Sequence, residues 1–76
     1  MLLYNLKRIR IKKGLTLKQL SQRTGISTTY LNDLENLKRD NLGYERMERL
    51  TKVLNVTAKE LKTQNTKGIN DEKNIS

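Results

Sequence analysis

The sequence predicts an all-α domain, a compact bundle of five short helices. Apolar residues recur at helical spacing along most of the chain, and no alternating run reaches the length of a strand. Glycines and helix-capping residues divide this pattern into five segments. The 76 residues suffice for one domain, and without Cys or His its stability must come from packing and caps.

The first two helices are bounded by recognisable start and stop signals. Gly14 follows the first helix, which is expected over residues 3–13, and supplies the left-handed residue that often ends a helix. Thr16 is expected to cap the second helix, where Gln19 three residues later completes a capping box. Gly25 is then expected to end the second helix as Gly14 ends the first.

The remaining three helices follow from the same kinds of signal. Ser27 is expected to cap the third helix, and the polar stretch 38–41 is expected to form the loop behind it. A fourth helix should begin near Gly43 and carry apolar residues at helical spacing. Thr57 and Glu60 form a second capping box, which opens a short fifth helix.

Charge divides the chain into a basic domain and a neutral tail. Lys and Arg number 16 against 8 Asp and Glu, which gives a formal net charge of +8. Residues 63–76 hold two of each sign, so the excess lies within 1–62, and we expect 63–76 to form a flexible polar tail. A domain this basic attracts polyanions, of which nucleic acid is the usual partner and an anionic membrane surface the competing one.

Several other functions have no support in the composition. No apolar run approaches the roughly 20 residues that cross a bilayer, and residues 1–5 turn polar too early for a signal peptide, so a cytoplasmic location is expected. Without His and Cys, zinc lacks nitrogen and sulfur ligands, and neither residue type is present for acid–base or nucleophilic work. We therefore expect no catalytic activity, metal, cofactor or small-molecule ligand.

Residues 16–35 contain the most specific pattern in the chain. Only Gly25 and Ile26 separate the second helix from the cap of the third, and a turn this short makes two helices cross steeply. Ile26 is expected to fill the space between the helices, while Leu20 and Leu31 meet across the crossing. The two helices should form a rigid pair from which the third helix protrudes.

These residues resemble the Cro/CI-type (lambda-repressor-like, XRE) family of helix-turn-helix proteins. The similarity covers about residues 3–62 and is carried by Leu6-x-x-Ile9-Arg10-x-x-Lys13-Gly14-Leu15-Thr16 and Leu20-x4-Gly25-Ile26-Ser27-x-x-Tyr30-Leu31-x-x-Leu34-Glu35-Asn36. Members have a compact five-helix fold, and most are transcriptional regulators that bind operator DNA as dimers. The resemblance implies a sequence-specific repressor that binds double-stranded DNA as a homodimer and reads the major groove with the helix around Thr28–Glu35.

Four residues of the third helix occupy positions that face the major groove in this family. Thr offers a methyl group for the thymine methyl and a hydroxyl for a base edge. An Asn amide can bind adenine through two hydrogen bonds, and an Asp can accept from cytosine N4. The candidate base-reading residues are Thr28, Thr29, Asn32 and Asp33.

Basic and polar residues flank that face and are candidates for phosphate contacts. The N–H groups at the start of the second helix add an anion site. Tyr30 could bind a phosphate through its hydroxyl or simply pack against the fourth helix. The candidate phosphate-binding residues are Thr16, Lys18, Arg23, Tyr30, Asn36, Lys38 and Arg39.

The resemblance also assigns a structural ion pair and reveals departures from the family pattern. Arg10 and Glu35 stand where family members form an internal ion pair. Leu17 replaces the usual Gln, whose side chain touches a DNA phosphate, and Leu42 replaces the usual Pro. Leu37 replaces the usual Gly, so either this leucine adopts the costly left-handed conformation or the third helix runs on past it.

A second class of function stays open on the same fold. Related domains serve as antitoxins or as bridging subunits, and Asp33 on the reading helix together with Leu17 favours such a protein-interaction module. The charge of +8 favours DNA instead. The homodimer contact on DNA is expected around the fifth helix and the start of the tail, at Val56 and Leu61.

Overall fold

Five α-helices make up the computed structural model, which describes residues 2–40 and 42–63. They are α1 (Leu6–Lys12), α2 (Leu17–Thr24), α3 (Thr28–Glu35), α4 (Tyr44–Leu54) and α5 (Ala58–Lys62). No strand occurs in the described residues. The predicted all-α fold of five helices is therefore confirmed, while the predicted tail lies, apart from Thr63, outside the described residues.

Side-chain caps begin three of the helices where the sequence predicts. The hydroxyl of Thr16 accepts from the N–H of Gln19 at 3.0 Å, and Oε1 of Gln19 accepts from the N–H of Thr16 at 2.9 Å. Thr57 and Glu60 form the same capping box at the start of α5, and Ser27 caps α3. Because caps satisfy backbone donors that lack an intrahelical partner, these residues fix where α2, α3 and α5 begin.

α1 begins at Leu6, later than predicted, because the segment before it is tied to α5. The backbone N–H of Asn5 donates to the carbonyl of Leu61 at 3.0 Å, and its side-chain amide donates to the carbonyl of Glu60 at 3.2 Å. Leu3 in the same segment is buried. The N-terminal residues thus join the core as a turn held by α5, closed by the bond from the N–H of Leu6 to the carbonyl of Leu3, and not as part of the helix.

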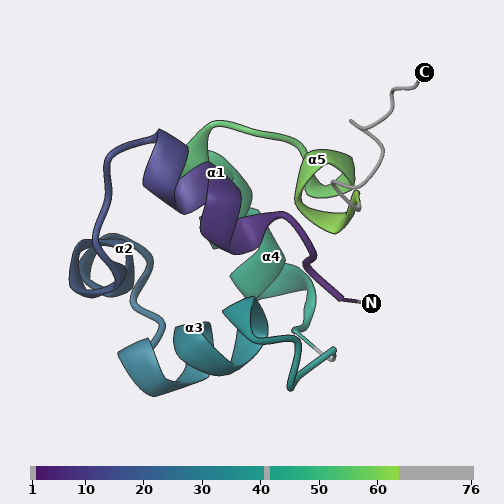
Figure 1. Cartoon of the computed structure of the whole chain (residues 1–76), viewed down its shortest axis with the longest axis horizontal. Coiled ribbons are helices and arrows are strands. Elements are labelled where there is room, and N and C mark those ends of the chain that lie inside the picture. Colours follow the sequence, from purple (N-terminus) through teal and green to yellow (C-terminus); the bar gives the residue numbers. More distant parts are fainter. Residues whose placement is uncertain (1, 41, 64–76) are drawn as a thin grey trace.

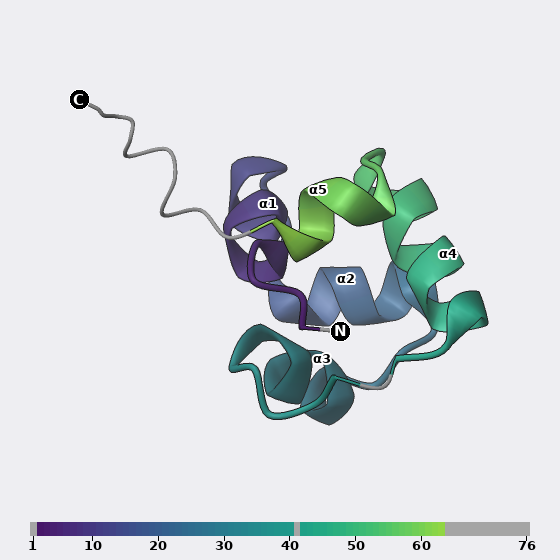
Figure 2. The same cartoon turned by 90° about the vertical axis from the view of Figure 1, so that its right-hand side faces the viewer.

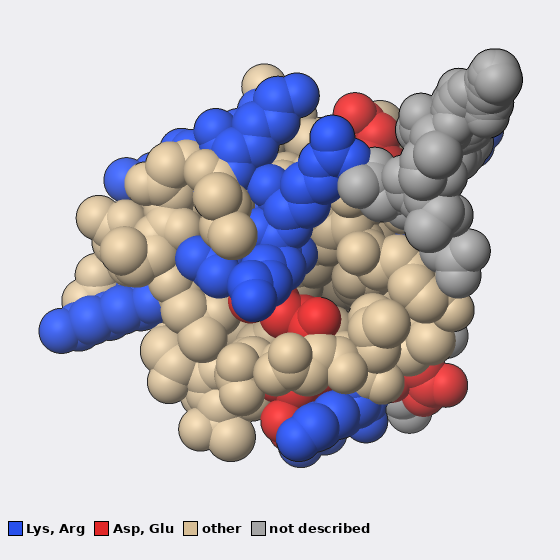
Figure 3. Space-filling view, viewed as in Figure 1, with Lys and Arg blue, Asp and Glu red and all other residues tan. Residues whose placement is uncertain are grey.

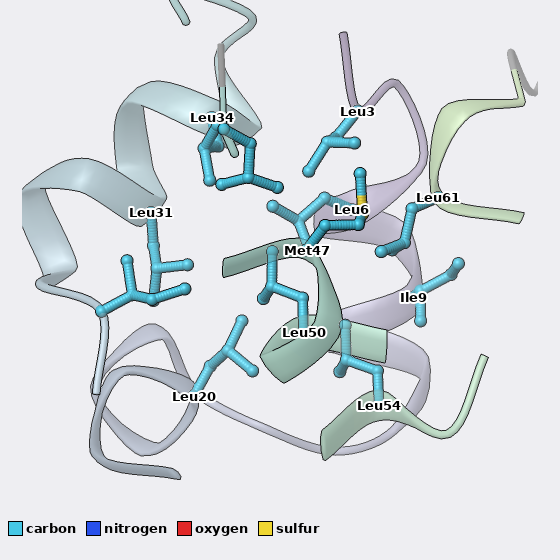
Figure 4. Packing of buried hydrophobic residues seen from close by; sticks show 12 residues of the cluster. Leu3, Leu6, Ile9, Leu20, Leu31, Leu34, Met47, Leu50, Leu54 and Leu61 are labelled. Atoms are coloured by element: carbon cyan, nitrogen blue, oxygen red, sulfur yellow. The ribbon is translucent and has the colours of Figure 1, made fainter. Parts of the chain in front are cut away.

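One apolar core connects all five helices (Figure 4). Its side chains point toward one another from every helix and from the connecting segments. The buried apolar residues are Leu3, Leu6, Ile9, Leu20, Ile26, Leu31, Leu34, Leu42, Met47, Leu50, Leu54 and Leu61. Truncating a buried leucine to alanine typically costs about 2–5 kcal/mol, so the members that α2 and α3 supply hold these two helices firmly against the rest.

α3 lies at one edge of the bundle (Figures 1 and 2). Both views place it on the outside, beside α2 and away from α5. Its inner face contributes Leu31 and Leu34 to the core, and both side chains are fully buried. The opposite face of α3 is consequently presented to solvent.

The end of α3 decides between the two alternatives for Leu37. Its N–H donates to the carbonyl of Leu34 at 3.2 Å, and the N–H of Lys38 donates to the carbonyl of Asp33 at 2.8 Å. This is the Schellman arrangement, in which the residue after the cap is left-handed. Leu37 has φ of 60°, as Gly14 has 76° after α1. The helix does not run on past Leu37, and that expectation is wrong.

Candidate nucleic-acid interface

The turn between α2 and α3 is built as the sequence predicts. Gly25 adopts φ of 76° and donates its N–H to the carbonyl of Ser21 at 2.8 Å. The hydroxyl of Ser21 donates to the carbonyl of Ile26 at 2.5 Å, and the hydroxyl of Thr24 accepts from the N–H of Ile26 at 3.2 Å. Ile26 is buried between the helices. Side-chain bonds therefore lock the backbone of the turn and with it the angle at which α3 leaves α2.

The outer face of α3 is polar and accessible. Thr28, Thr29 and Asn32 are all exposed, and each is a residue that the sequence nominates for reading bases. The side-chain oxygen of Asn32 accepts from the amide of Asn36 at 3.2 Å, one turn further along the helix surface. That bond orients the Asn32 amide and leaves its NH₂ group available as a donor.

Asp33, the fourth candidate base reader, belongs to a cluster of charged and aromatic side chains. Its Oδ2 accepts from Nε of Arg39 at 3.3 Å, and the guanidinium of Arg39 lies 4.3 Å from the centre of the Tyr30 ring. The guanidinium of Arg46, from α4, lies 4.6 Å from the same ring centre. Cations over an aromatic face are attracted by its quadrupole. We call Tyr30, Asp33, Arg39 and Arg46 the Tyr30 cluster.

The start of α2 offers backbone donors on an exposed turn. The first intrahelical bond runs from the N–H of Leu20 to the carbonyl of Thr16. The N–H groups of Leu17 and Lys18, which precede it, point out of the helix end. The side chain of Lys18 is exposed beside them, whereas that of Leu17 packs against the core. An anion could meet two N–H groups and an ammonium group here.

The other candidate phosphate ligands lie around α2 and the end of α3. Arg23 stands in the last turn of α2, and Asn36 and Lys38 follow directly after α3; all three are exposed. Figure 3 shows Lys and Arg side chains spread over the region of α1 and gathered again at the lower edge, beside the segment after α3. The predicted residues thus surround α3 without all touching one another.

Sequence reasoning missed two arginines of α4. Arg46 joins the Tyr30 cluster. Arg49 donates to the carbonyl of Thr24, at the end of α2, at 3.5 Å and pairs with Glu45 at 3.1 Å. Each stands directly before a buried residue of α4, Arg46 before Met47 and Arg49 before Leu50. This spacing is the signal that could have placed both arginines beside the buried face of α4 and hence near α2 and α3.

Arg10 and Glu35 form the internal ion pair that the sequence predicts. Nε of Arg10 donates to Oε2 of Glu35 at 2.5 Å and Nη2 donates to Oε1 at 3.2 Å, so the contact is bidentate. Nη1 also donates to the carbonyl of Leu15 at 2.8 Å. The side chains are only 12% and 4% exposed, respectively. The pair therefore ties α1 to the end of α3 inside the fold.

The surface beside α5 exposes only one of the two residues predicted for the dimer contact. Leu61 is fully buried in the core and cannot reach a second chain, so its assignment to such a contact is wrong. A shallow groove of about 470 Å³ lies nearby and is lined by residues that include Leu42, Met47 and Ala58. Tyr44 borders this groove with 82% of its surface exposed.

Two other features are absent from the part of the chain that the structure describes. Over residues 2–40 and 42–63, no three or more His, Cys, Asp or Glu side chains gather as metal ligands would. None of the helices described there has the length and apolar character needed to cross a bilayer.

Comparison with known proteins places the chain in a family. A helix-turn-helix family model matches residues 6–61, from the first residue of α1 to the buried leucine of α5. No curated protein and no solved structure matches the chain. The matched segment includes the locked turn, the exposed face of α3 and the Arg10–Glu35 pair. The chain belongs to the XRE (Cro/CI-type) helix-turn-helix family of DNA-binding regulators.

Proposed function

We propose that this chain is a transcriptional repressor that binds operator DNA in the cytoplasm as a homodimer and inserts α3 into the major groove. The observation that carries the proposal is the division of α3 into two faces. Leu31 and Leu34 anchor it fully in the core, while Thr28, Thr29 and Asn32 stand exposed on a helix at the edge of the fold. A rigidly held helix with polar outer residues can enter a groove without rearrangement.

The exposed face of α3 has the chemistry for base readout. The hydroxyl groups of Thr28 and Thr29 can donate to or accept from base edges, and their methyl groups can contact thymine. The NH₂ group of Asn32 can donate to N7 of adenine, as one half of the bidentate contact that this residue type makes. These three residues are the proposed determinants of sequence preference.

Phosphate contacts come from both sides of α3 in this proposal. At one side lie the N–H groups at the start of α2 together with Lys18. At the other side lie Lys38, Arg39 and Arg46, which follow α3 or face it from α4. Such contacts fix the position of a protein on the duplex and account for most of its salt dependence.

A homodimer is proposed because one domain offers too little contact for specific binding. Specific sites are typically bound with dissociation constants near 10⁻⁸ M or below, and two domains on half-sites about 34 Å apart provide the required area. We place the contact on the surface around α5, where Val56 is partly exposed. Footprinting that protects one short site without symmetry would contradict the dimer.

Two variants separate base readout from backbone affinity. Asn32→Ala should weaken binding to a duplex obtained by in vitro selection by about 1–3 kcal/mol and leave binding to a random duplex nearly unchanged. Lys38→Ala, its matched control, should weaken both duplexes and lower the slope of log K against log salt by about 0.9. Equal weakening of both duplexes by Asn32→Ala would mean that α3 is not the reading helix.

A second candidate function is a protein-interaction module of the antitoxin or bridging type. It is favoured by the groove beside α5 and by exposed Tyr44, because an exposed aromatic residue at an apolar groove is a common protein contact. The two functions differ in salt dependence. If the purified chain binds a mixed pool of duplexes without a steep dependence on salt, the interaction module is the better description.

A further inference from the structure

We propose that Asp33 does not read a base but positions Arg39 for a DNA phosphate, with the Tyr30 ring as the platform on which Arg39 rests. This inference rests on the proposed function and changes the role of Asp33 within it. It follows from the Tyr30 cluster, in which a carboxylate of α3 and an arginine of the next loop meet at 3.3 Å.

The backbone brings Arg39 back toward α3. Because Leu37 is left-handed, the chain reverses after α3, and the N–H of Lys38 donates to the carbonyl of Asp33 at 2.8 Å. Residue 39 then follows immediately beside the side chain of Asp33. The contact between these two residues is thus built into the end of α3 and does not depend on a long flexible excursion of either side chain.

The contact uses only part of the arginine. Asp33 accepts from Nε, and the guanidinium carbon lies over the Tyr30 ring, 4.3 Å from its centre. The N–H groups on Nη1 and Nη2 have no hydrogen-bond partner among the described residues, and 46% of the Arg39 side chain is exposed. Since an arginine presents its donors as a rigid fork, holding Nε on Asp33 and the guanidinium carbon over Tyr30 restricts where the terminal donors point.

The same contact explains how an acidic side chain is tolerated on a helix that meets DNA. An unpaired carboxylate would repel the phosphates, whereas Asp33 is paired with Arg39 and only 28% exposed. Arg46 over the same ring adds a second positive charge to this corner. A side chain ordered before binding avoids an ordering cost that corresponds to about two- to tenfold in affinity.

The test compares two substitutions that change net charge equally. Asp33→Asn removes the carboxylate of the cluster, and Glu48→Gln removes a carboxylate that pairs with Lys52 within α4 at 3.6 Å. Repulsion alone predicts that both substitutions strengthen binding to a random-sequence duplex. Positioning predicts that Asp33→Asn weakens binding about two- to tenfold and lowers its salt slope, while Glu48→Gln does not.

A double-substitution cycle with Arg39→Gln shows whether Asp33 acts through Arg39. If it does, Asp33→Asn has no further weakening effect once Arg39 is replaced. Stronger DNA binding by Asp33→Asn would overturn the inference. A loss of affinity that is confined to the selected duplex and persists in the Arg39→Gln background would also overturn it, because such a loss marks a base-reading residue. Failure of the unaltered chain to bind either duplex would instead overturn the proposed function itself. Urea unfolding of each variant verifies that the fold is intact.

Discussion

Two carboxylates of α3 stand two residues apart and meet arginines in contrasting surroundings. Glu35 binds Arg10 through two hydrogen bonds in a contact where the side chains are 4% and 12% exposed, respectively. Asp33 binds Arg39 through one bond, with exposures of 28% and 46%. Glu35 connects α3 to α1, whereas Asp33 connects α3 to the loop that follows it.

The Arg10–Glu35 pair stabilises the fold, whereas the Asp33–Arg39 pair orders a side chain on the surface. Removing water from a charged pair makes each partner depend strongly on the other, because a lone buried charge is costly. An exposed pair gains little net stability, since water and salt screen it. The pair at Glu35 should therefore govern unfolding, and the pair at Asp33 should govern how Arg39 meets a partner.

The largest effect is expected from Glu35→Ala. Arg10 would remain mostly buried with its charge uncompensated, which should lower the free energy of unfolding by about 3 kcal/mol, near the lower end for broken buried pairs because Arg10 keeps some exposure. Urea unfolding followed by circular dichroism measures this change.

The matched control replaces both partners. Arg10→Met combined with Glu35→Leu leaves no buried charge, and such a swap should recover most of the lost stability. If the double variant is no more stable than Glu35→Ala, the side chains matter through packing and not through their charges. The comparison with Asp33→Asn, for which a change below about 1 kcal/mol is expected, completes the contrast.

Local signals allowed most of the fold to be predicted from the sequence. The caps Thr16, Ser27 and Thr57 and the left-handed Gly25 act within a few residues of their own position, so their chemistry is visible without a structure. The start of α1 was misplaced because the bond from Asn5 to α5 joins distant parts of the chain. No periodicity in the first residues reports such a contact.

The candidate interface could be predicted less completely. The exposure of Thr28, Thr29 and Asn32 follows from helical spacing, because Leu31 and Leu34 define the buried face. Predicting the pair of Asp33 with Arg39 requires knowing the direction of the chain after α3. That direction depends on whether Leu37 is left-handed or continues the helix, and the sequence leaves both alternatives open. Arg46 reaches Tyr30 from α4; its place directly before the buried Met47 indicates its side of α4, but the contact itself depends on how α3 and α4 pack.

An intermediate effect is expected at Gly14, which occupies after α1 the left-handed position that Leu37 occupies after α3. Nothing lies within 4 Å of a Cβ built on Gly14. Gly14→Ala should thus measure backbone strain alone, a loss of about 1 kcal/mol in the free energy of unfolding. A neutral result would mean that this conformation costs the chain little.

Leu37→Gly makes the reverse change at the end of α3. It relieves the left-handed strain but loses contacts of a side chain that is 40% exposed, so a net gain below about 1 kcal/mol is expected. Thermal unfolding of Gly14→Ala and Leu37→Gly in the same buffer measures both changes in stability. A loss of stability in Leu37→Gly as large as that in Gly14→Ala would show that the contacts of Leu37 outweigh its strain.

The smallest effect on stability is expected from Arg39→Gln, although its effect on DNA binding should be clear. The pair with Asp33 is half exposed, so its loss should change the free energy of unfolding by less than about 1 kcal/mol. That small difference should vanish in about 1 M salt, where the screening length falls to roughly 3 Å, whereas the loss in Glu35→Ala should persist. Binding to a random duplex should lose about 0.9 from its salt slope if Arg39 contacts one phosphate. A large loss of stability that survives high salt would make Arg39 a structural residue like Arg10, and the distinction between the two ion pairs of α3 would fail.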